Sequence, residues 1–593
     1  MGAGTAQGGA CLLISGKVRK NMEFVVFAGV LLLLFIFMIV QELIQTKNQE
    51  KLFKKYLREN YGKEPPKEYS LERFARLGSY LERHKEEKQL DDITWNDLGM
   101  DEVFRRIDRT YSAAGEEYLY YTLRNISCGR EALEHLEEVV NWLQEQENIK
   151  VRIQLLMKRL GHLGKYSLYD YLDNLDYLGE RSNRKIVLEN LLYLPFLLLL
   201  FVQPAMGTIG IVLCMLWHIM TYFREKKVIE PYIISFAYVL RLIDVCEELE
   251  KQKIPVYRRE LDELREALKS LRELRRGAYW VMAGNQGKIG GNPLDILADY
   301  LRMILHLDIW QFNLMLRKLR LKTNEVDRLL GITGYLDMAI SVGGFRRSLE
   351  GYCIPQLEEN TNKVYLHMEG GWHPLLTHPV KNSIRADRGV LLTGSNASGK
   401  STFLKMVAVN AVLAQTIHTC AAESYHAPIF QIFSSMALRD SMENGESYYI
   451  VEIRSLKRIL DAAGERRTPV LCFVDEVLRG TNTVERIAAA TQILIRLAES
   501  GTLGFAATHD IEMTELLKEY YDNYHFEEVI RDGDILFPYQ LLPGKASTRN
   551  AIRLLQMMGY EEQIIKKASG QAENFLKTGK WINTPAAISE GTT

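Results

Sequence analysis

A glycine-rich segment followed by a lysine and two hydroxyl residues gives the strongest chemical signal in the chain. Residues 394–402 read GSNASGKST and match the pattern GxxxxGK[ST] of a phosphate-binding loop. Glycines let the backbone turn tightly, so that N–H groups and a helix N-terminus can point at phosphate oxygens. The alternative, an ordinary glycine-rich turn, requires the whole pattern to arise by chance. We expect nucleotide contacts from Gly394, Ser395, Asn396, Ala397, Ser398, Gly399, Lys400, Ser401 and Thr402.

Two residues of this loop have specific roles in phosphate chemistry. Lys400 can reach the β- and γ-phosphates, which makes it a catalytic candidate, and the Ser401 hydroxyl can ligate Mg²⁺. The flanking sequence fits, because 390–392 is a short apolar run typical of a strand and 403–415 is typical of a helix. Strand, loop and helix in this order form the setting of a phosphate-binding loop. The sequence therefore predicts binding of a nucleotide with Mg²⁺.

A second apolar run ends in two carboxylates. Residues 470–474 read VLCFV and are followed by Asp475 and Glu476, about 75 residues after the phosphate loop. The carboxyl end of a parallel strand is where a second Mg²⁺ contact belongs, and we assign that contact to Asp475. Glu476 then lies near the γ-phosphate, where it could act as general base on the attacking water. The alternative is an exposed strand end without chemistry.

A third apolar run, residues 502–507, leads to His509. A histidine at the carboxyl end of a neighbouring strand can contact the γ-phosphate and respond to its loss. A single histidine is more often a satisfied surface or core residue, and only its place after the strand favours the catalytic role.

Together these motifs resemble the MutS branch of the ABC-type ATPases. Residues 475–482, DEVLRGTN, are similar to the family's DE-x-x-RGT segment, and residues 444–452, NGESYYIVE, are similar to its signature region. The resemblance implies ATP hydrolysis by a homodimer, in which Ser447 of one subunit opens a helix that meets the γ-phosphate held by the other. Glu446 stands where an arginine or similar residue is more usual in the family.

The resemblance covers roughly residues 95–575 but lacks parts of the family pattern. Residues 104–123 look like the start of the MutS core domain, 329–339 like the end of its lever helix, and 550–568 like its closing helix-turn-helix. Fewer than a hundred residues precede the core, which leaves no room for the mismatch-reading and connector domains. An apolar hairpin stands in place of the clamp domain. Mismatch specificity is therefore not expected to carry over.

Two apolar stretches predict attachment to a membrane. Residues 24–40 run for about 17 residues without a charge, and residues 191–223 contain no Asp, Glu, Lys or Arg. Pro204 favours two helices that turn near Gln203 over one long helix. Basic residues on both flanks of the second stretch predict a multi-pass protein of the cell membrane with a cytoplasmic ATPase domain. The alternatives are a signal peptide for the first stretch and a buried helical pair for the second.

The composition is that of a folded, multidomain chain. It has 593 residues, of which 47% are hydrophobic and 25% charged. A net charge of −1 excludes a globally basic nucleic-acid wrapper, and seven scattered cysteines without a CxxC pair argue against a disulfide framework and a zinc ribbon. The expected fold is a helical transmembrane anchor and hairpin, an all-α MutS-like core and lever domain, and a C-terminal α/β P-loop ATPase domain. The expected segments are an N-terminal tail (1–22), a transmembrane helix (23–42), the first part of the core and lever (43–185), a transmembrane hairpin (186–223), the lever and core return (224–350) and the ATPase domain with its helix-turn-helix (351–593).

The target of the ATPase has two explanations. The family resemblance implies DNA, mispaired or branched, and Arg272, Arg275 and Arg276 near the end of a lever-like helix are candidate contacts, although a solvated helix face would look the same. The apolar hairpin and the missing mismatch domains favour instead a membrane-anchored ATPase or scaffold that acts on protein or lipid. A solute transporter is disfavoured, because three short spans give little pathway and no LSGGQ signature is present.

Overall fold

The computed structural model divides into two compact units, Met1–Tyr61 and Gly62–Thr593. In the first unit, residues 44–60 are helical, and the predicted transmembrane helix at 23–42 lies almost entirely outside the described residues. The description covers residues 37–581 apart from 38–39, 42–43, 65–68, 70, 87, 127–128, 164–166, 276–299, 302, 360, 362, 396–397, 437–447, 466–467, 479–480, 532–533 and 547–550.

The second unit begins with a mostly helical part, as the sequence predicts. Two of its helices, α6 and α12, carry apolar residues three to four positions apart, and most of these residues are buried. The helices of this part are α2 (Leu71–Arg83), α3 (Asp92–Leu98), α4 (Met100–Ile107), α5 (Ala113–Arg124), α6 (Arg130–Glu145), α7 (Glu147–Leu160), α8 (Leu168–Leu172), α9 (Arg184–Leu191), α10 (Tyr193–Val202), α11 (Pro204–Glu250), α12 (Arg258–Leu271), α15 (Leu307–Arg320) and α16 (Thr323–Ser348).

Helices α5 and α16 pack closely at the centre of this helical part. Gly334 makes the approach possible, because a Cβ there would lie 2.6 Å from the carbonyl oxygen of Ala114. The buried Asp337 carboxylate accepts hydrogen bonds from the backbone N–H groups of Tyr111 (3.0 Å) and Ser112 (2.9 Å), just before α5 begins. Since the first N–H groups of a helix and its lead-in have no partner within the helix, this carboxylate stabilises the start of α5 from another element.

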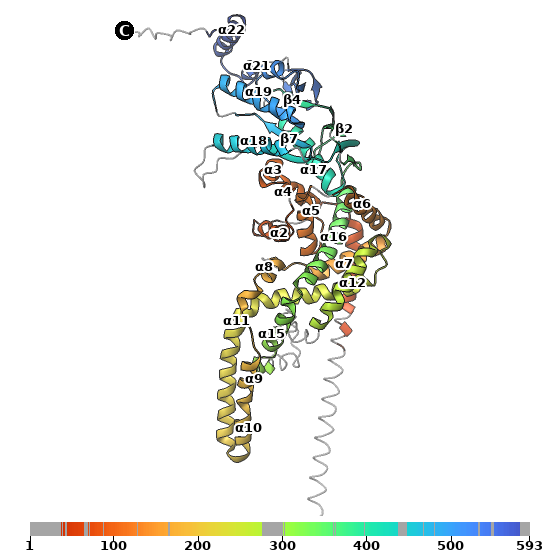
Figure 1. Ribbon diagram of the computed structural model, residues 1–593, viewed down its shortest axis with the longest axis vertical. Coiled ribbons are helices and arrows are strands. Elements are labelled where there is room, and N and C mark those ends of the chain that lie inside the picture. The colour runs from red at the N-terminus through yellow and green to blue at the C-terminus, as the bar shows by residue number, and fades with distance from the viewer. Residues whose placement is uncertain are drawn as a thin grey trace, which may run out of the picture. The chain divides into compact units, whose positions relative to one another are not determined.

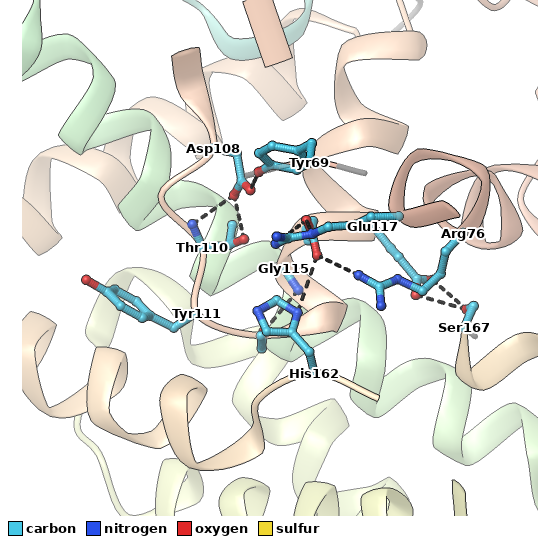
Figure 2. A network of polar contacts seen from close by, with 12 residues as sticks. Tyr69, Arg76, Asp108, Thr110, Tyr111, Gly115, Glu117, His162 and Ser167 are labelled. Carbon is cyan, nitrogen blue, oxygen red and sulfur yellow. Dashed lines mark hydrogen bonds and ion pairs between the residues drawn. The ribbon is translucent and has the colours of Figure 1, made fainter. Parts of the chain in front are cut away.

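A buried ionic network joins α5 to its neighbours (Figure 2). The Glu116 carboxylate is fully buried and pairs with the guanidinium groups of Arg73 (2.6 Å) and Arg76 (3.3 Å) on α2. His162, which follows α7, lies 3.3 Å from the same carboxylate. A buried carboxylate is expensive unless it is paired, so the network fixes which faces of these helices meet.

The adjacent Glu117 makes the stability of this part dependent on pH. Burial raises the pKa of Glu117 to about 8, and hydrogen bonds from Ser167 and the charge of Arg76 oppose that shift. Between these two pKa values the folded chain keeps the proton on Glu117, whereas the unfolded chain, with a pKa of about 4.3, loses it. The contribution of Glu117 to the free energy of unfolding is therefore most favourable below about pH 4.3 and is lost as the pH rises through 8. We expect Glu117→Gln, which is always neutral, to raise the melting temperature more at pH 8.5 than at pH 5.

Thermal unfolding at a series of pH values measures this difference. Glu145→Gln, at an exposed position of α6, is the control and should follow the wild-type profile. Parallel profiles for the wild type and Glu117→Gln would contradict the assignment.

The predicted hairpin is present as two antiparallel helices. Helix α10 ends at Val202 and α11 begins at Pro204, so the chain turns at Gln203, where the sequence predicts the turn (Figure 1). The two helices approach closely at Gly210, where a Cβ would lie 2.0 Å from the ring of Phe196. Small residues at such crossings let two apolar helices pack tightly.

The outer surface of the hairpin is apolar and exposed. The most apolar 18 residues within 184–202 have a mean hydropathy of 2.0, and 6% of them are buried. The most apolar 18 residues within 204–230 have a mean hydropathy of 1.6, and 28% of them are buried. Phe201, next to the turn, is 90% exposed. By length and composition both helices could cross a membrane, and exposed apolar surface of this extent requires a partner of some kind.

Helix α11 does not end with the apolar hairpin. It continues past residue 223 to Glu250, and its second half buries Ile233, Phe236, Leu240 and Ile243 against the helical core. The predicted segment boundary at 223 therefore falls inside one helix. The apolar hairpin and the core share a single helix.

The C-terminal part is an α/β domain built on a six-stranded sheet. The strand order is β12-β9-β4-β8-β7-β6, in which β9, β4, β8, β7 and β6 are parallel and β12 is antiparallel (Figure 1). The strands are β4 (Gly389–Thr393), β6 (Gln431–Ser435), β7 (Val470–Asp475), β8 (Thr502–Ala507), β9 (Tyr521–His525) and β12 (Leu542–Pro543). Helices of this domain are α17 (Lys400–Ile417), α18 (Tyr448–Glu465), α19 (Thr483–Glu499) and α20 (Met513–Leu516).

Smaller elements complete the domain. A four-stranded sheet has the order β1-β5-β2-β3, and β10 pairs with β11 in a two-stranded sheet. The predicted closing helix-turn-helix corresponds to two helices that turn at Gly559. The bounds are β1 (Gln356–Glu358), β2 (Leu366–Gly371), β3 (Asn382–Ala386), β5 (Ser424–Pro428), β10 (Val529–Arg531), β11 (Asp534–Leu536), α21 (Ala551–Met557) and α22 (Glu562–Thr578).

Candidate functional site

The three predicted strands place their chemical residues at one edge of the sheet. Strand β8 lies between β4 and β7 and is parallel to both, with Ala507 paired to Leu392 on one side and to Asp475 on the other. Because parallel strands end at the same edge, the residues after β4, β7 and β8 come together. This arrangement joins the phosphate loop, the acidic pair and His509.

The phosphate loop has the backbone conformation that its glycines allow. Gly394 has φ 144° and Gly399 has φ 107°, and a Cβ on Gly394 would lie 2.6 Å from the carbonyl oxygen of Phe526. Lys400, at the start of α17, donates from Nζ to the carbonyl oxygens of Gly394 (2.8 Å) and Ser395 (2.9 Å). Burial lowers the pKa of Lys400. A phosphate beside this ammonium would offset that cost of burying its charge.

Ser401 and Asp475 meet although they lie far apart in the sequence. The Ser401 hydroxyl donates to Oδ2 of Asp475 at 2.5 Å. Burial raises the pKa of Asp475, and the hydrogen bond from Ser401 opposes the rise. A hydroxyl and a carboxylate oxygen side by side suit Mg²⁺, which prefers oxygen ligands and would offset the buried negative charge.

Glu476 and His509 form a direct contact. Nε2 of His509 lies 2.7 Å from Oε1 of Glu476. The backbone of Glu476 has φ 54°, and its N–H donates to the carbonyl oxygen of Ala507 at 2.9 Å. A non-glycine residue in the left-handed region is uncommon, and such residues concentrate at functional sites.

Lys400, Ser401 and Glu476 line one cavity of about 460 Å³, and Asp475 and His509 each contact one of these lining residues. Its wall includes Ser395, Gly399, Lys400, Ser401, Thr402 and Glu476, together with residues that are mostly apolar or aromatic. Those other residues are His373, Leu376, His378, Val380, Asn382, Phe403, Met406, Phe526 and Tyr539. A phosphate-binding end and a largely apolar opposite wall give the cavity the character of a nucleotide site.

Some residues of the wall, and one that contacts it, were missed from the sequence. Tyr539 lies against Gly399, at 3.0 Å from a Cβ built there, and Asn382 holds it by donating to its carbonyl oxygen at 2.9 Å. Glu528 accepts a hydrogen bond from the Ser395 hydroxyl at 2.9 Å. Burial, with the charge of Lys405 as a lesser cause, lowers the pKa of His373 to about 4, so this histidine is neutral at pH 7. No local motif marks these positions.

Several predicted residues lie elsewhere or outside the described part of the chain. Ser398 is buried beneath the loop, 3.0 Å from a Cβ built on Gly394. Arg272 is exposed, with Glu247 (3.9 Å) and Glu250 (3.6 Å) of α11 within ion-pair distance. The candidates outside the described residues are Asn396, Ala397, Ser447 and Arg276.

The fold and the site define a P-loop nucleotide-binding domain. In its parallel sheet, the phosphate loop follows β4, the acidic pair lies at the end of β7, and His509 follows β8, which lies between those two strands. The family model for MutS domain V matches residues 390–576. The C-terminal domain thus belongs to the MutS family, as the motifs predict.

Curated relatives support the same assignment. The DNA mismatch repair protein MutS of Thermus thermophilus is 33% identical over 223 residues, which cover 37% of this chain and 26% of that protein. The protein of the same name from Natronomonas pharaonis is 31% identical over 252 residues, or 41% of this chain and 28% of the relative. The one from Lactobacillus acidophilus is 30% identical over 231 residues, with 37% and 26% covered. The chain thus spans about a quarter of the length of these relatives.

Proposed function

We propose that the chain is a MutS-type ATPase that binds and hydrolyses ATP with Mg²⁺ and works as a homodimeric switch. The observation that carries the proposal is that Lys400, Ser401 and Glu476 line one cavity, with Asp475 bonded to Ser401 and His509 in contact with Glu476. Structural ion pairs alone do not require a cavity between them, whereas ATP hydrolysis requires a phosphate site, a metal site and a base within reach of one another.

Each group has a role that its position permits. Lys400 binds the β- and γ-phosphates after releasing the carbonyl oxygens of its own loop, and Ser401 and Asp475 hold Mg²⁺. When bound, Mg²⁺ neutralises part of the charge on the phosphate oxygens. Glu476 accepts a proton from the attacking water, and His509 orients the Glu476 carboxylate through their 2.7 Å contact.

The similarity to MutS proteins supports the proposed dimer. Ser447, outside the described residues, immediately precedes α18, which begins at Tyr448. In the proposed dimer it contacts the γ-phosphate held by the other subunit. ATP binding then closes the pair and hydrolysis releases it, which makes the dimer a two-state device.

We further propose that the apolar hairpin attaches the protein to the cell membrane, as a multi-pass protein with its ATPase domain in the cytoplasm. The apolar helices of 19 and 27 residues and the exposure of their side chains support this attachment. Basic residues at the base of the hairpin, such as Arg181, Arg184 and Lys226, are suited to the cytoplasmic surface.

The relatives are named DNA mismatch repair proteins, which makes mispaired or branched DNA the first candidate target. The second candidate is a protein or lipid target at the membrane, and the exposed hairpin on the core helix α11 favours it. Among the candidate DNA contacts, Arg272 lies beside two acidic residues of α11, an arrangement that lowers the positive potential available to phosphates.

ATPase activity of the detergent-solubilised protein, with and without duplex, mismatched and branched DNA, decides between these targets. A DNA-directed enzyme should be stimulated and should bind with an affinity that falls steeply with salt. Turnover that responds to none of these DNAs would leave the protein or lipid target. Absence of ATP turnover under all of these conditions would contradict the proposal that the protein hydrolyses ATP.

A further inference from the structure

The turn that carries Glu476 holds two strained residues close together. Glu476 has φ 54° and Leu478 has φ 57°. Bulky side chains rarely adopt the left-handed region, and such a conformation persists only where the surrounding structure holds it. The position of the Glu476 carboxylate therefore depends on what fixes this turn.

A buried carboxylate of α18 fixes one of these residues. Oε1 of Glu452 accepts a hydrogen bond from the backbone N–H of Leu478 at 2.5 Å. Glu452 is 3% exposed, and its Oε2 has no hydrogen-bond partner within the described part of the chain. Burying a carboxyl group with a single hydrogen bond, here to the N–H of a turn, is energetically unfavourable. The position of Glu452 therefore calls for an explanation.

The side chains of the turn meet the same helix. Val477 and Leu478 are 5% and 4% exposed and belong to a core cluster that includes Leu456 and Ile459 of α18. Helix α18 therefore contacts the turn through both apolar packing and the Glu452 hydrogen bond. A shift of α18 would have to move the turn or break both contacts.

Glu452 lies near the beginning of α18. The helix begins at Tyr448, so Glu452 is four residues, or about 6 Å, along its axis. In the proposed dimer Ser447, the residue before Tyr448, contacts the nucleotide of the other subunit. The same short stretch of helix thus faces one nucleotide and holds the catalytic turn of the other.

We propose that Glu452 is a positioning residue for Glu476: it ties the catalytic turn to α18 of the same chain, the helix whose first residues face the partner's nucleotide. This inference rests on the proposed function. It assigns to Glu452 an effect on the rate of hydrolysis and none on the binding of ATP, since Glu452 does not line the cavity.

Steady-state kinetics of the full chain in detergent tests the role of the acceptor oxygen. We expect Glu452→Ala to lower kcat about 10–100-fold, because a small misplacement of a catalytic group has that effect, while KM for ATP changes less than twofold. Glu452→Gln keeps an oxygen acceptor and should restore kcat to within threefold of the wild type. Asp461→Ala, which removes an exposed carboxylate from the same helix, is the control and should leave kcat unchanged.

Mixed dimers test whether the effect stays within one chain. With Glu452→Ala in one subunit and Glu476→Gln in the other, turnover should fall to about half of that of the Glu452→Ala homodimer, because only one slowed site is left. With both substitutions in one subunit and a wild-type partner, about half of the wild-type turnover should remain. Melting temperatures of the single variants show whether they fold.

The outcomes separate the two proposals. A wild-type protein without turnover would contradict the proposed function. A wild type that hydrolyses ATP would overturn the inference alone if Glu452→Ala kept its kcat, if Glu452→Gln lost as much activity as Glu452→Ala, or if the two mixed dimers were equally active.

Discussion

Glu476→Gln should slow ATP hydrolysis about 10²–10⁴-fold while leaving the affinity for ATP within twofold of the wild type, because a general base contributes to the rate by about that factor. Glutamine keeps the shape of the side chain and can still accept a hydrogen bond from His509, whose Nε2 lies 2.7 Å from Oε1 of Glu476. It cannot accept the proton of the attacking water. Single-turnover hydrolysis, measured together with equilibrium ATP binding, separates these two effects.

The variant should also change the assembly state. With hydrolysis blocked, ATP should accumulate in the closed dimer, which size-exclusion chromatography with light scattering can detect. Glu519→Gln is a matched control, because Glu519 is exposed near Tyr521, which pairs with Gly389 at the opposite end of β4. Wild-type turnover in Glu476→Gln would remove Glu476 from the role of base.

Lys400→Ala should weaken the binding of ATP and not only slow its hydrolysis. A charge-assisted hydrogen bond is worth about 1.5–3 kcal/mol, so its loss should raise the dissociation constant of ATP about 10–100-fold. Lys400→Arg should bind weakly as well, because the ammonium lies within the loop, 2.8 and 2.9 Å from two of its carbonyl oxygens. Titration calorimetry with a slowly hydrolysed ATP analogue and Mg²⁺ measures the change.

A lysine remote from the cavity provides the comparison. Lys518 is exposed near the amino end of β9, and Lys518→Ala should bind ATP with wild-type affinity. If Lys400→Ala also bound with wild-type affinity, residues 394–402 would not be the phosphate-binding loop.

The nucleotide motifs were accessible from the sequence because their signals are local. Strands β4, β7 and β8 are short apolar runs, and each ends in the residues that carry chemistry. The rule that parallel strands end at one edge was sufficient to bring Lys400, Asp475, Glu476 and His509 together. The turn at Gln203 was equally accessible, because proline cannot donate a helix hydrogen bond.

The rest of the site depends on contacts between distant segments. Tyr539 lies against Gly399 and accepts a hydrogen bond from Asn382, which is 157 positions away in the sequence. Glu452 looks like any acidic residue of an amphipathic helix until its bond to Leu478 is seen. Such positions carry no composition or spacing signal, since their roles arise from the tertiary packing.

The length of α11 was also beyond local prediction. Basic residues at 224, 226 and 227 mark the end of the apolar stretch, yet basic side chains are good helix formers and do not stop a helix. The helix therefore continues from the hairpin into the core without a break at that place.

Shortening the protein for solution work has to respect this continuity. Helix α11 has 47 residues and is about 70 Å long, and roughly its first 20 belong to the hairpin. Excising residues 186–223 would create a fresh helix start at Arg224, with four backbone N–H groups newly left without acceptors. A trimmed version should supply a serine or aspartate ahead of that start and a linker long enough to reach it from the preceding residues.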